Sequence, residues 1–510
     1  MIIKNLTSQV GLIPQQYVVT TVAFLAVITV NSLIKNGFKA YVKVFIYAIL
    51  IGFTLFYYSG LDVISKVFAV LCLLVGAFLT VYTQTYERVK YGGGGLTSLI
   101  DTFVFSIYFV FISTELSIFI MAWLFAEIIG FFNIVYEVER RTLVAGLRYL
   151  LISMIPSDIA LLTMLGVVAG KLSLGEAFLT PVNGLNKILT DVNPAFYTLI
   201  LLGFLGKAAV APFHFWLPDA HSLAPAPASA VLSGVMVKMG IYGIFRIIPS
   251  VPSTDYTLYL LTFLSSITVI YSGLQALTQT DIKRVLAYST IENTGIIVLA
   301  LTTYRLFNLD VLFTGALLYS LAHGIFKAAL FMNSGVVEVL THTRELPKLG
   351  YLGRVAPKPT YSALISTMSL IGIPPSLGFV SKVLVFTGFA EAILNSPPVG
   401  VLLVSVLAVG LALSAAYGSR YMLTYWGAIK VKPPSEVRGV PQLESSDFTM
   451  SLMNVVATFP TLIVLGLHAL GSTLTASLLV LSTLALAVMW YAYTYVKNIL
   501  SKPLWLGGSV

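Results

Sequence analysis

Charge and cysteine are both scarce in this chain of 510 residues. Only 10% of its residues are charged and only one, Cys72, is a cysteine, whereas soluble domains carry about a quarter charged residues. A single cysteine excludes a disulfide framework and a cysteine metal cluster, so we expect Cys72 to be a small buried packing residue. Five histidines leave few ligands for a redox centre, and we expect no cofactor and no metal in this chain.

Known nucleotide-binding and redox motifs are also missing. The glycine-rich stretch YGGGGLTS at 91–98 lacks the G-K-[ST] ending of a phosphate-binding loop, so we interpret it as a connector. The sequence has no dinucleotide fingerprint and no haem ligand pair. These absences argue against an enzyme that holds its own electron carrier.

What the chain has in abundance is apolar sequence. Hydrophobic residues make up 57% of it, its mean hydropathy is +0.92, and apolar runs of transmembrane length recur from end to end. The sequence predicts an all-α polytopic membrane protein with about 14–15 transmembrane helices. We place them near 17–34, 41–59, 62–83, 97–113, 116–136, 147–170, 194–216, 226–248, 257–277, 282–303, 310–335, 361–391, 399–427, 450–470 and 473–497.

The net charge of the chain is +9, but its lysines and arginines lie mainly in short loops between apolar segments and do not cluster on one exposed face. This distribution argues against nucleic acid as a partner. Alternate loops of one side collect Lys35, Lys39, Lys43, Arg88, Lys90, Arg140, Arg141, Arg148, Lys283, Arg284, Arg344, Lys348, Arg354, Lys358, Lys430, Lys432, Arg438, Lys497 and Lys502. The other side has Lys4, Lys66, Lys171, Lys187, Arg246 and Arg305. Positive loops face the cytoplasm, which predicts a multi-pass plasma-membrane protein with its N-terminus outside.

Two predicted helices contain prolines that interrupt them. The stretch LGKAAVAPFHFWLPDAH at 205–221 contains Pro212 and Pro218, and LIGIPPSLGFVSK at 370–382 contains Pro374 and Pro375. Broken backbone in a membrane is tolerated where it is buried in protein or lines a wet cavity. Interrupted helices in corresponding repeats indicate an ion or substrate site. We therefore predict two inverted five-helix repeats, 97–248 and 257–427, between N-terminal helices in 1–96 and C-terminal helices in 428–510.

Several ionisable residues lie deep within predicted spans, where each costs about 2.5–3.5 kcal/mol on insertion scales. They are Glu127, Asp158, Lys207, Lys238, His323, Lys327 and Lys382. One interpretation is that they form structural salt bridges between helices. Four lysines with so few acidic partners cannot all be paired, however, and an unpaired buried lysine exchanges its proton readily. We therefore favour a role in proton transfer, above all for Glu127, Lys207, Lys238 and Lys382.

Other ionisable residues lie nearer the ends of predicted spans. We expect Asp101 and Glu115 to reach headgroups or water, as charges at helix ends commonly do. His214, Asp219 and His221 surround the first proline break at the cytoplasmic mouth. Their spacing crosses a proline and no further ligand lies nearby, which argues against a metal site. We interpret them as polar groups that guide protons towards the break.

Four blocks of the sequence resemble the antiporter-like membrane subunits shared by respiratory complex I, multisubunit Na⁺/H⁺ antiporters and energy-converting membrane-bound hydrogenases. They are GKAAVAPFHFWLPDAHSLAPAPASAVLSGVMVKMGIYGIFR (206–246), DIKRVLAYSTIENTGII (281–297), AHGIFKAALFMNSG (322–335) and GIPPSLGFVSK (372–382). The resemblance covers about residues 97–427 in consistent order. The segment IENTGII is similar to the corresponding segment of the hydrogenase-type members or of the related sulfur reductases.

This resemblance implies roles for individual residues. Glu127 and Lys207 match the glutamate and lysine that pair on the fifth helix and the broken seventh helix, with Glu115 a second candidate whose spacing fits less well. Asp158 matches an acidic position that accompanies this pair. Lys238 matches the central lysine, His323 and Lys327 match polar positions on the eleventh helix, and Lys382 matches the terminal ionisable position. Together these positions resemble a row of protonatable groups across the membrane midplane.

The function implied is ion translocation in a respiratory membrane complex related to complex I, driven by a partner's redox reaction. The implied partners are the lipid bilayer, other membrane subunits (a second antiporter-like or Mrp-type subunit among them) and a peripheral redox arm with nickel–iron and iron–sulfur centres. Two alternatives stay open: a subunit of a multisubunit Na⁺/H⁺ antiporter without a redox partner, and a scaffold whose buried charges are structural. A quinone-reducing enzyme is disfavoured because nothing offers a quinone pocket beside a redox centre.

Overall fold

The structure is a computed structural model that describes residues 14–34, 37–58, 60–427, 440–468 and 472–500. Its elements are helices throughout these ranges, with two isolated β-bridges that join Glu115 to Pro181 and Asp281 to Glu345. The predicted all-α fold is thereby confirmed. Some loop charges used to predict the topology lie outside the described residues: Lys4, Lys35, Lys430, Lys432, Arg438 and Lys502.

The first half of the chain contains α2 (Gln15–Leu33), α3 (Phe38–Phe56), α4 (Val63–Tyr91), α5 (Leu96–Ile112), α6 (Leu116–Ile134), α7 (Arg140–Tyr149), α8 (Ile155–Lys171), α9 (Leu174–Phe178), α10 (Leu185–Ile188), α11 (Pro194–Ala208), α12 (Trp216–Leu223), α13 (Ala226–Val231) and α14 (Val237–Ile247). A π-helical turn, η1 (Leu150–Met154), joins α7 to α8, and another, η3 (Leu232–Met236), joins α13 to α14. Short 3₁₀ turns are η2 (Val182–Gly184) and η4 (Ile248–Ser250).

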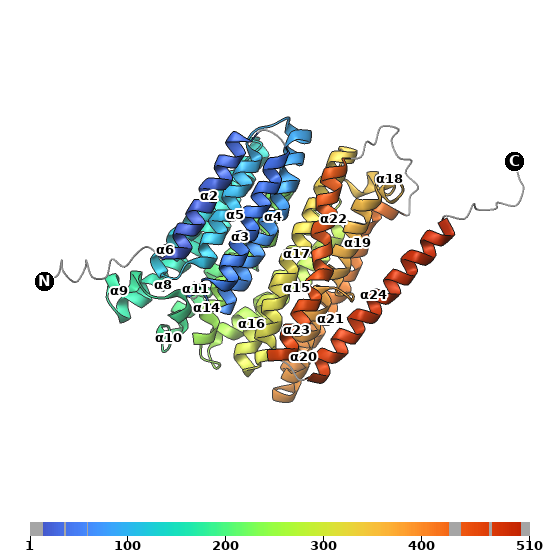
Figure 1. Cartoon of the computed structure of the whole chain (residues 1–510). Coiled ribbons are helices and arrows are strands. Elements are labelled where there is room, and N and C mark those ends of the chain that lie inside the picture. Colours follow the sequence, from blue (N-terminus) through green and yellow to red (C-terminus); the bar gives the residue numbers. More distant parts are fainter. Residues whose placement is uncertain (1–13, 35–36, 59, 428–439, 469–471, 501–510) are drawn as a thin grey trace, which may run out of the picture.

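The second half contains α15 (Tyr256–Thr278), α16 (Ile282–Phe307), α17 (Asp310–Thr341), the 3₁₀ turn η5 (Leu346–Lys348), α18 (Leu352–Val355), α19 (Pro357–Ile371), α20 (Leu377–Asn395), α21 (Pro397–Trp426), α22 (Pro441–Val456), α23 (Thr458–His468) and α24 (Ser472–Leu500). Figure 1 shows the early helices α2–α5 at one end of the bundle and α19–α23 at the other. The helix α24 lies along the outer edge of this second end.

Within the described ranges, twelve helical segments are long and apolar enough to cross a membrane. Three shorter apolar segments accompany them: Leu96–Ile112, Pro194–Ala208 and Leu474–Met489. Each of the fifteen predicted spans overlaps a helix of the structure. The three predicted spans that correspond to these shorter segments are 97–113, 194–216 and 473–497. Of these, the span at 194–216 is shortened because its helix ends at the break after Ala208.

The most deeply buried helices lie in the middle of the bundle. The segment Ala226–Ser250 is buried throughout, and α16 and α17 are buried along most of their length. The long helix α17 packs against α4, α13, α16, α19, α20 and α22, and so connects the two ends of the molecule. The polar residues His323, Lys327 and Asn333 of α17 are consequently fully buried.

Both predicted breaks are present. The helix α11 ends at Ala208, Ala209 takes a left-handed backbone with φ of 55°, and α12 begins only at Trp216, with Pro212 between them. In the second half α19 ends at Ile371, Gly372 has φ of 93°, and α20 begins at Leu377, after Pro374 and Pro375. Each break leaves carbonyl groups of the preceding turn without helical partners.

Candidate functional site

A direct ion pair lies between the first broken helix and α6. The Nζ of Lys207 is 2.6 Å from Oε1 of Glu127, and both side chains are 0% exposed. The same Oε1 accepts hydrogen bonds from Trp123 Nε1 (2.9 Å) and the Ser157 hydroxyl (2.6 Å). Lys207 also donates to the Tyr149 hydroxyl at 3.2 Å. The structure therefore brings together the two residues that the sequence pairs.

Asp158 accompanies this pair from α8. It follows Ser157 directly, is half-buried, and interacts electrostatically with Glu127 and Lys207. Its Oδ1 is buried and accepts no hydrogen bond from the described residues. A second carboxyl group is therefore available beside the ion pair, as the sequence predicts.

Lys238 and His323 form the next contact of the site. Lys238 is the second residue of α14, which follows the π-helical turn η3. Its Nζ donates to the Ser233 carbonyl at 2.8 Å and contacts His323 Nδ1 at 2.6 Å. A π-helical turn changes the local hydrogen bonding of a helix, and such turns are frequent at functional sites. A Cβ on Gly234 would come within 3.2 Å of the Gly324 carbonyl, so glycine here allows η3 to approach α17 closely.

Lys327 lies one turn further along α17. It donates to the Leu286 carbonyl at 3.0 Å and to the hydroxyl of Ser289, both on α16. Neither partner is an acid. Lys327 instead interacts at longer range with Glu292, which carries the opposite charge, and with Lys382, which carries the same charge.

Lys382 reaches back from α20 across the second break. Its Nζ donates to the carbonyls of Leu370 (2.5 Å) and Ile371 (3.3 Å), which the end of α19 leaves free. A Cβ on Gly372 would lie 2.8 Å from the Lys382 Cδ, so glycine at this position makes room for the lysine stem. The break thus supplies the oxygen ligands of the ammonium group.

Glu292 belongs to this cluster although sequence reasoning did not nominate it. It is fully buried in α16 and accepts hydrogen bonds from the hydroxyls of Ser414 (2.8 Å) and Tyr417 and from the Asn293 amide (3.0 Å). It interacts electrostatically with Lys382 and Lys327. Its position in the middle of the predicted span 282–303 was the available signal.

The three residues around the first break do not lie together at one mouth. His221 is fully buried, with its ring 4.7 Å from that of Phe331 and neither ring nitrogen hydrogen-bonded to a described residue. It interacts electrostatically with Lys327 and Lys238, so it belongs to the interior cluster. His221 is therefore buried in the protein rather than open to solvent at the break, and its role in guiding protons stays a prediction.

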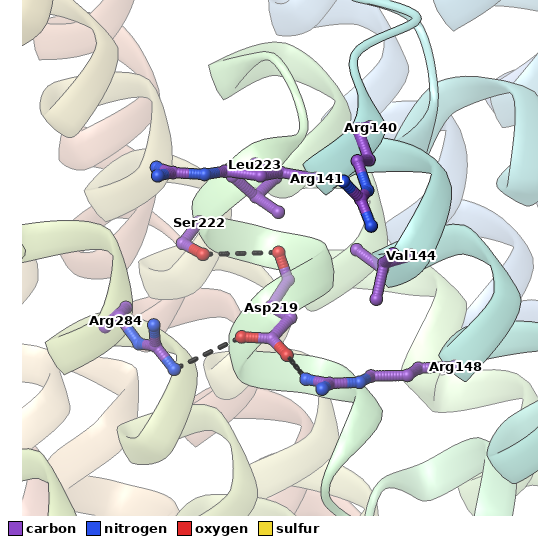
Figure 2. Close-up of a pocket in the computed structure, with 9 residues that line it drawn as sticks. Arg140, Arg141, Val144, Arg148, Asp219, Ser222, Leu223 and Arg284 are labelled. Atoms are coloured by element: carbon purple, nitrogen blue, oxygen red, sulfur yellow. Dashed lines mark hydrogen bonds and ion pairs between the residues drawn. The ribbon is translucent and has the colours of Figure 1, made fainter.

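Asp219 and His214 lie further out. Asp219 accepts hydrogen bonds from Arg148 and, at 3.2 Å, from Arg284, as Figure 2 shows. His214 is almost completely buried and packs its ring against Phe215 and Tyr271, at centroid distances of 4.0 and 5.2 Å. Asp219 therefore holds two arginines, whereas His214 has apolar surroundings.

Two expectations about charges near helix ends were wrong. Asp101 was expected to reach headgroups or water, but it is 1% exposed and lies 2.6 Å from the Nζ of Lys43, which is itself buried rather than in a loop. Arg246 was likewise assigned to a loop, yet it is buried and bound to Asp62 at 2.7 Å. In both cases a neighbouring helix supplies a counter-ion that the sequence pattern does not reveal.

Glu115 lies where the sequence places it, at the start of α6, and accepts hydrogen bonds from the hydroxyls of Tyr17 (2.7 Å) and Thr114 (2.8 Å). It does not contact Lys207, so the ion pair is made by Glu127. In the part of the chain that the structure describes, no group of three or more His, Cys, Asp or Glu residues could hold a metal ion.

Comparison with known proteins identifies the family. Residues 113–410, more than half of the chain, match the family described as "NADH:quinone oxidoreductase/Mrp antiporter, TM". The chain belongs to this family. It is an antiporter-like, multi-pass membrane subunit of the kind found in complex I-related assemblies, as the sequence resemblance implies.

Individual relatives agree with this assignment. Hydrogenase-4 component B of Escherichia coli (strain K12) is 28% identical over 402 residues, which cover 75% of this chain and 59% of that protein. The curated relatives are longer, and the chain spans between 39% and 59% of their length.

Solved structures show the same fold. The Mrp complex from Dietzia sp. DQ12-45-1b aligns with a TM-score of 0.74 at 22% identity, over 96% of this chain and 58% of that chain. The archaeal membrane-bound sulfane sulfur reductase aligns with a TM-score of 0.73 at 23% identity, over 86% of this chain and 75% of that one. The predicted family and its fold are confirmed.

Proposed function

We propose that this chain translocates protons through its row of buried ionisable groups, within a larger membrane complex. The observation that carries the proposal is the row itself: the Glu127–Lys207 ion pair, the Lys238–His323 contact, and then Lys327 and Lys382. Intramembrane ionisable residues are costly and mark ion paths by default. We place the two lysines on broken helices, Lys207 and Lys382, at opposite ends of the proposed row.

The first step of the proposed mechanism is separation of the Glu127–Lys207 pair. Two unit charges about 4 Å apart attract each other by ~4 kcal/mol at an effective dielectric of ~20. Displacing Glu127, or protonating it from Asp158, removes this attraction, and the Lys207 ammonium then releases its proton more readily. The Tyr149 hydroxyl, which Lys207 already contacts at 3.2 Å, lies on the route out.

In the proposed mechanism Lys238, His323 and Lys327 pass the proton on, and each returns to its starting protonation state. Lys238 Nζ contacts His323 Nδ1 at 2.6 Å, so the imidazole can accept a proton at Nδ1 and release another from Nε2. Lys327 lies one helical turn from His323 on α17, and His221 interacts electrostatically with both. Glu292 offsets the charge of Lys327 and Lys382 at the far end of the row.

The partner reaction is the finer part of this proposal. We propose a redox-driven complex of the hydrogenase or sulfur-reductase kind, with nickel–iron and iron–sulfur centres in other subunits. Support comes from the similarity to hydrogenase-4 component B and to the sulfane sulfur reductase complex. The alternative, a Na⁺/H⁺ antiporter subunit without a redox partner, is favoured by the Mrp complex. Mass spectrometry of the purified complex distinguishes them: hydrogenase-type and iron–sulfur proteins support the first, and only small membrane proteins the second.

The arrangement in the membrane is also proposed. We place the arginine-rich loops in the cytoplasm and the N-terminus outside, by the positive-inside rule. We further propose the division into repeats at 97–248 and 257–427, each with one broken helix. Cysteine labelling of single loop positions in sealed cells tests the orientation: labelling of the 171–193 loop from outside supports it.

Translocation is tested in vesicles that contain the purified complex. We expect Lys207→Ala and Glu127→Gln to lower proton movement about a hundredfold, as loss of a positioned proton-transfer group does. Lys187→Ala, at an exposed position, is the matched control and keeps full activity. Proton movement at the wild-type rate in Lys207→Ala would overturn the relay.

A second variant separates a relay from a scaffold. Lys207→Arg keeps a positive charge opposite Glu127, but arginine does not release its proton in proteins. We expect this variant to assemble normally and to lack proton movement. Normal transport in Lys207→Arg, with poor assembly in Lys207→Ala, would instead show that the buried charges are structural.

A further inference from the structure

An arginine-lined pocket opens on the surface of the bundle beside the first broken helix. It has a volume of about 550 Å³ and is lined by Arg140, Arg141 and Arg148 of α7 and Arg284 of α16, with Asp219 between them. Figure 2 shows the guanidinium groups of Arg148 and Arg284 directed at the Asp219 carboxylate, and Arg140 and Arg141 above them. The proposed relay uses none of these arginines.

Charge in this pocket is far from balanced. Asp219 is its one acid and is already shared between Arg148 and Arg284. Neither Arg140 nor Arg141 lies within ion-pair distance of a carboxylate among the described residues, and both are exposed. Four guanidinium groups against one carboxylate favour an anion with several oxygen acceptors.

The same helix continues from the pocket as an apolar, exposed face. Val144 and Ala145 line the pocket itself. Beside the lining residues, Leu143, Leu147 and Leu151 of α7 and η1 are 42%, 55% and 62% exposed. A stripe of exposed leucines on a transmembrane helix faces lipid, so the pocket opens where basic side chains meet the acyl region.

The pocket also lies at the ends of two candidate membrane spans. Arg140 is the first residue of the span Arg140–Lys171, and Arg284 lies in the first turn of the span Ile282–Phe307, ends that the proposed orientation puts in the cytoplasm. Basic pockets between transmembrane helices on the cytoplasmic side are typical sites for anionic lipid headgroups. Arginine is the residue that binds phosphate in a bidentate manner.

We propose that this pocket binds the phosphate headgroup of an anionic phospholipid from the surrounding bilayer. Arg140 and Arg141 donate to the phosphate oxygens, Arg148 and Arg284 complete the positive field while remaining bound to Asp219, and the acyl chains lie along the leucine stripe. The bound lipid would brace α7 against α12 and α16, which Asp219 already connects.

Native mass spectrometry of the full chain, released from micelles containing phosphatidylglycerol or phosphatidylcholine, tests this site. We expect the wild type to retain phosphatidylglycerol in preference to phosphatidylcholine. Arg140→Gln/Arg141→Gln should weaken phosphatidylglycerol binding about thirtyfold, since each basic residue near an anionic surface contributes about fivefold. Arg354→Gln/Lys358→Gln removes two exposed charges elsewhere and should leave retention unchanged.

Three results would overturn the proposal. Equal retention of phosphatidylglycerol by the two double variants would show that the pocket is not the binding site. Displacement of the lipid by glycerol phosphate at equal concentration would show that the site selects the free anion and not the lipid. Loss of a partner subunit from the purified complex, with unchanged lipid retention, would show that the surface is a protein interface.

Discussion

Each of the two broken helices contains a buried lysine, but the two lysines have different binding partners. In the first half, Lys207 forms an ion pair of 2.6 Å with Glu127. In the second half, Lys382 donates hydrogen bonds to two backbone carbonyls at its own helix break. The acid that interacts with it electrostatically, Glu292, accepts hydrogen bonds from hydroxyl and amide groups instead. No ion pair within 4 Å joins Lys382 to a described carboxylate.

This difference separates two kinds of proton site. A contact ion pair resists loss of its proton until the charges are pulled apart, so the first site responds to movement of a helix. Carbonyl oxygens at the end of a helix carry partial negative charge and bind an ammonium without neutralising it. We infer that the first site acts as the gate of the proposed pathway and the second as a site that exchanges protons without separating charges.

The largest difference is expected when each glutamate is neutralised. Glu127→Gln leaves Lys207 buried without its counter-charge, and removing one partner of a buried pair costs about 3–5 kcal/mol of stability. Glu292→Gln keeps hydrogen-bonding capacity and should cost about 1–2 kcal/mol. Thermal unfolding in detergent measures both, with the exposed Glu391→Gln as the control. Equal costs at Glu127 and Glu292 would remove the distinction between the two sites.

Double-mutant cycles measure the coupling within each pair. For Glu127→Gln with Lys207→Met we expect a coupling energy of about 2–3 kcal/mol, as for residues in direct contact. For Glu292→Gln with Lys382→Met we expect less than about 1 kcal/mol, because the two groups are not in contact. A stronger coupling in the second cycle than in the first would reverse the assignment of gate and exchange site.

The donors to each carboxylate give a smaller effect. Tyr417→Phe removes a hydroxyl donor from Glu292, and Trp123→Phe removes the indole donor from Glu127. Each substitution should lower the free energy of unfolding by no more than about 3 kcal/mol, the upper contribution of a hydrogen bond to a charged group. We expect Tyr417→Phe to cost more, because Glu292 lacks the lysine contact that compensates Glu127. Thermal unfolding of the two variants side by side tests this order.

A pH effect smaller still is expected outside both sites, at Asp62. Burial alone would raise the pKa of Asp62, but the Arg246 guanidinium and hydrogen bonds from Ser65 hold it below its usual value. The stabilisation is therefore complete above the unfolded pKa of about 3.9 and is lost as the pH falls through the lower folded value. Unfolding temperatures measured from pH 6 to pH 3 should fall less steeply in Asp62→Asn. An identical slope in both proteins would contradict this contribution.

Much of the site could be predicted from the sequence because a charged residue inside an apolar run is conspicuous. Glu127, Asp158 and Lys207 lie together in one cluster. His323 interacts with Lys238, Lys327 and Lys382 in a second cluster. Glu292 satisfies the same criterion. Asp101 and Lys43 lie near the ends of predicted spans, where charges commonly reach water, but the structure pairs and buries both.

The sequence by itself determined the class of the protein, its helices and both helix breaks. The length of an apolar run decides whether it can cross a membrane. Proline ends a helix because it lacks a backbone N–H and clashes with the preceding turn. Only the tertiary structure decided which charges meet. Glu127 pairs with Lys207 while Glu292 stands apart from Lys382, and His221 turns inward, because helix packing sets distances between residues far apart in the chain.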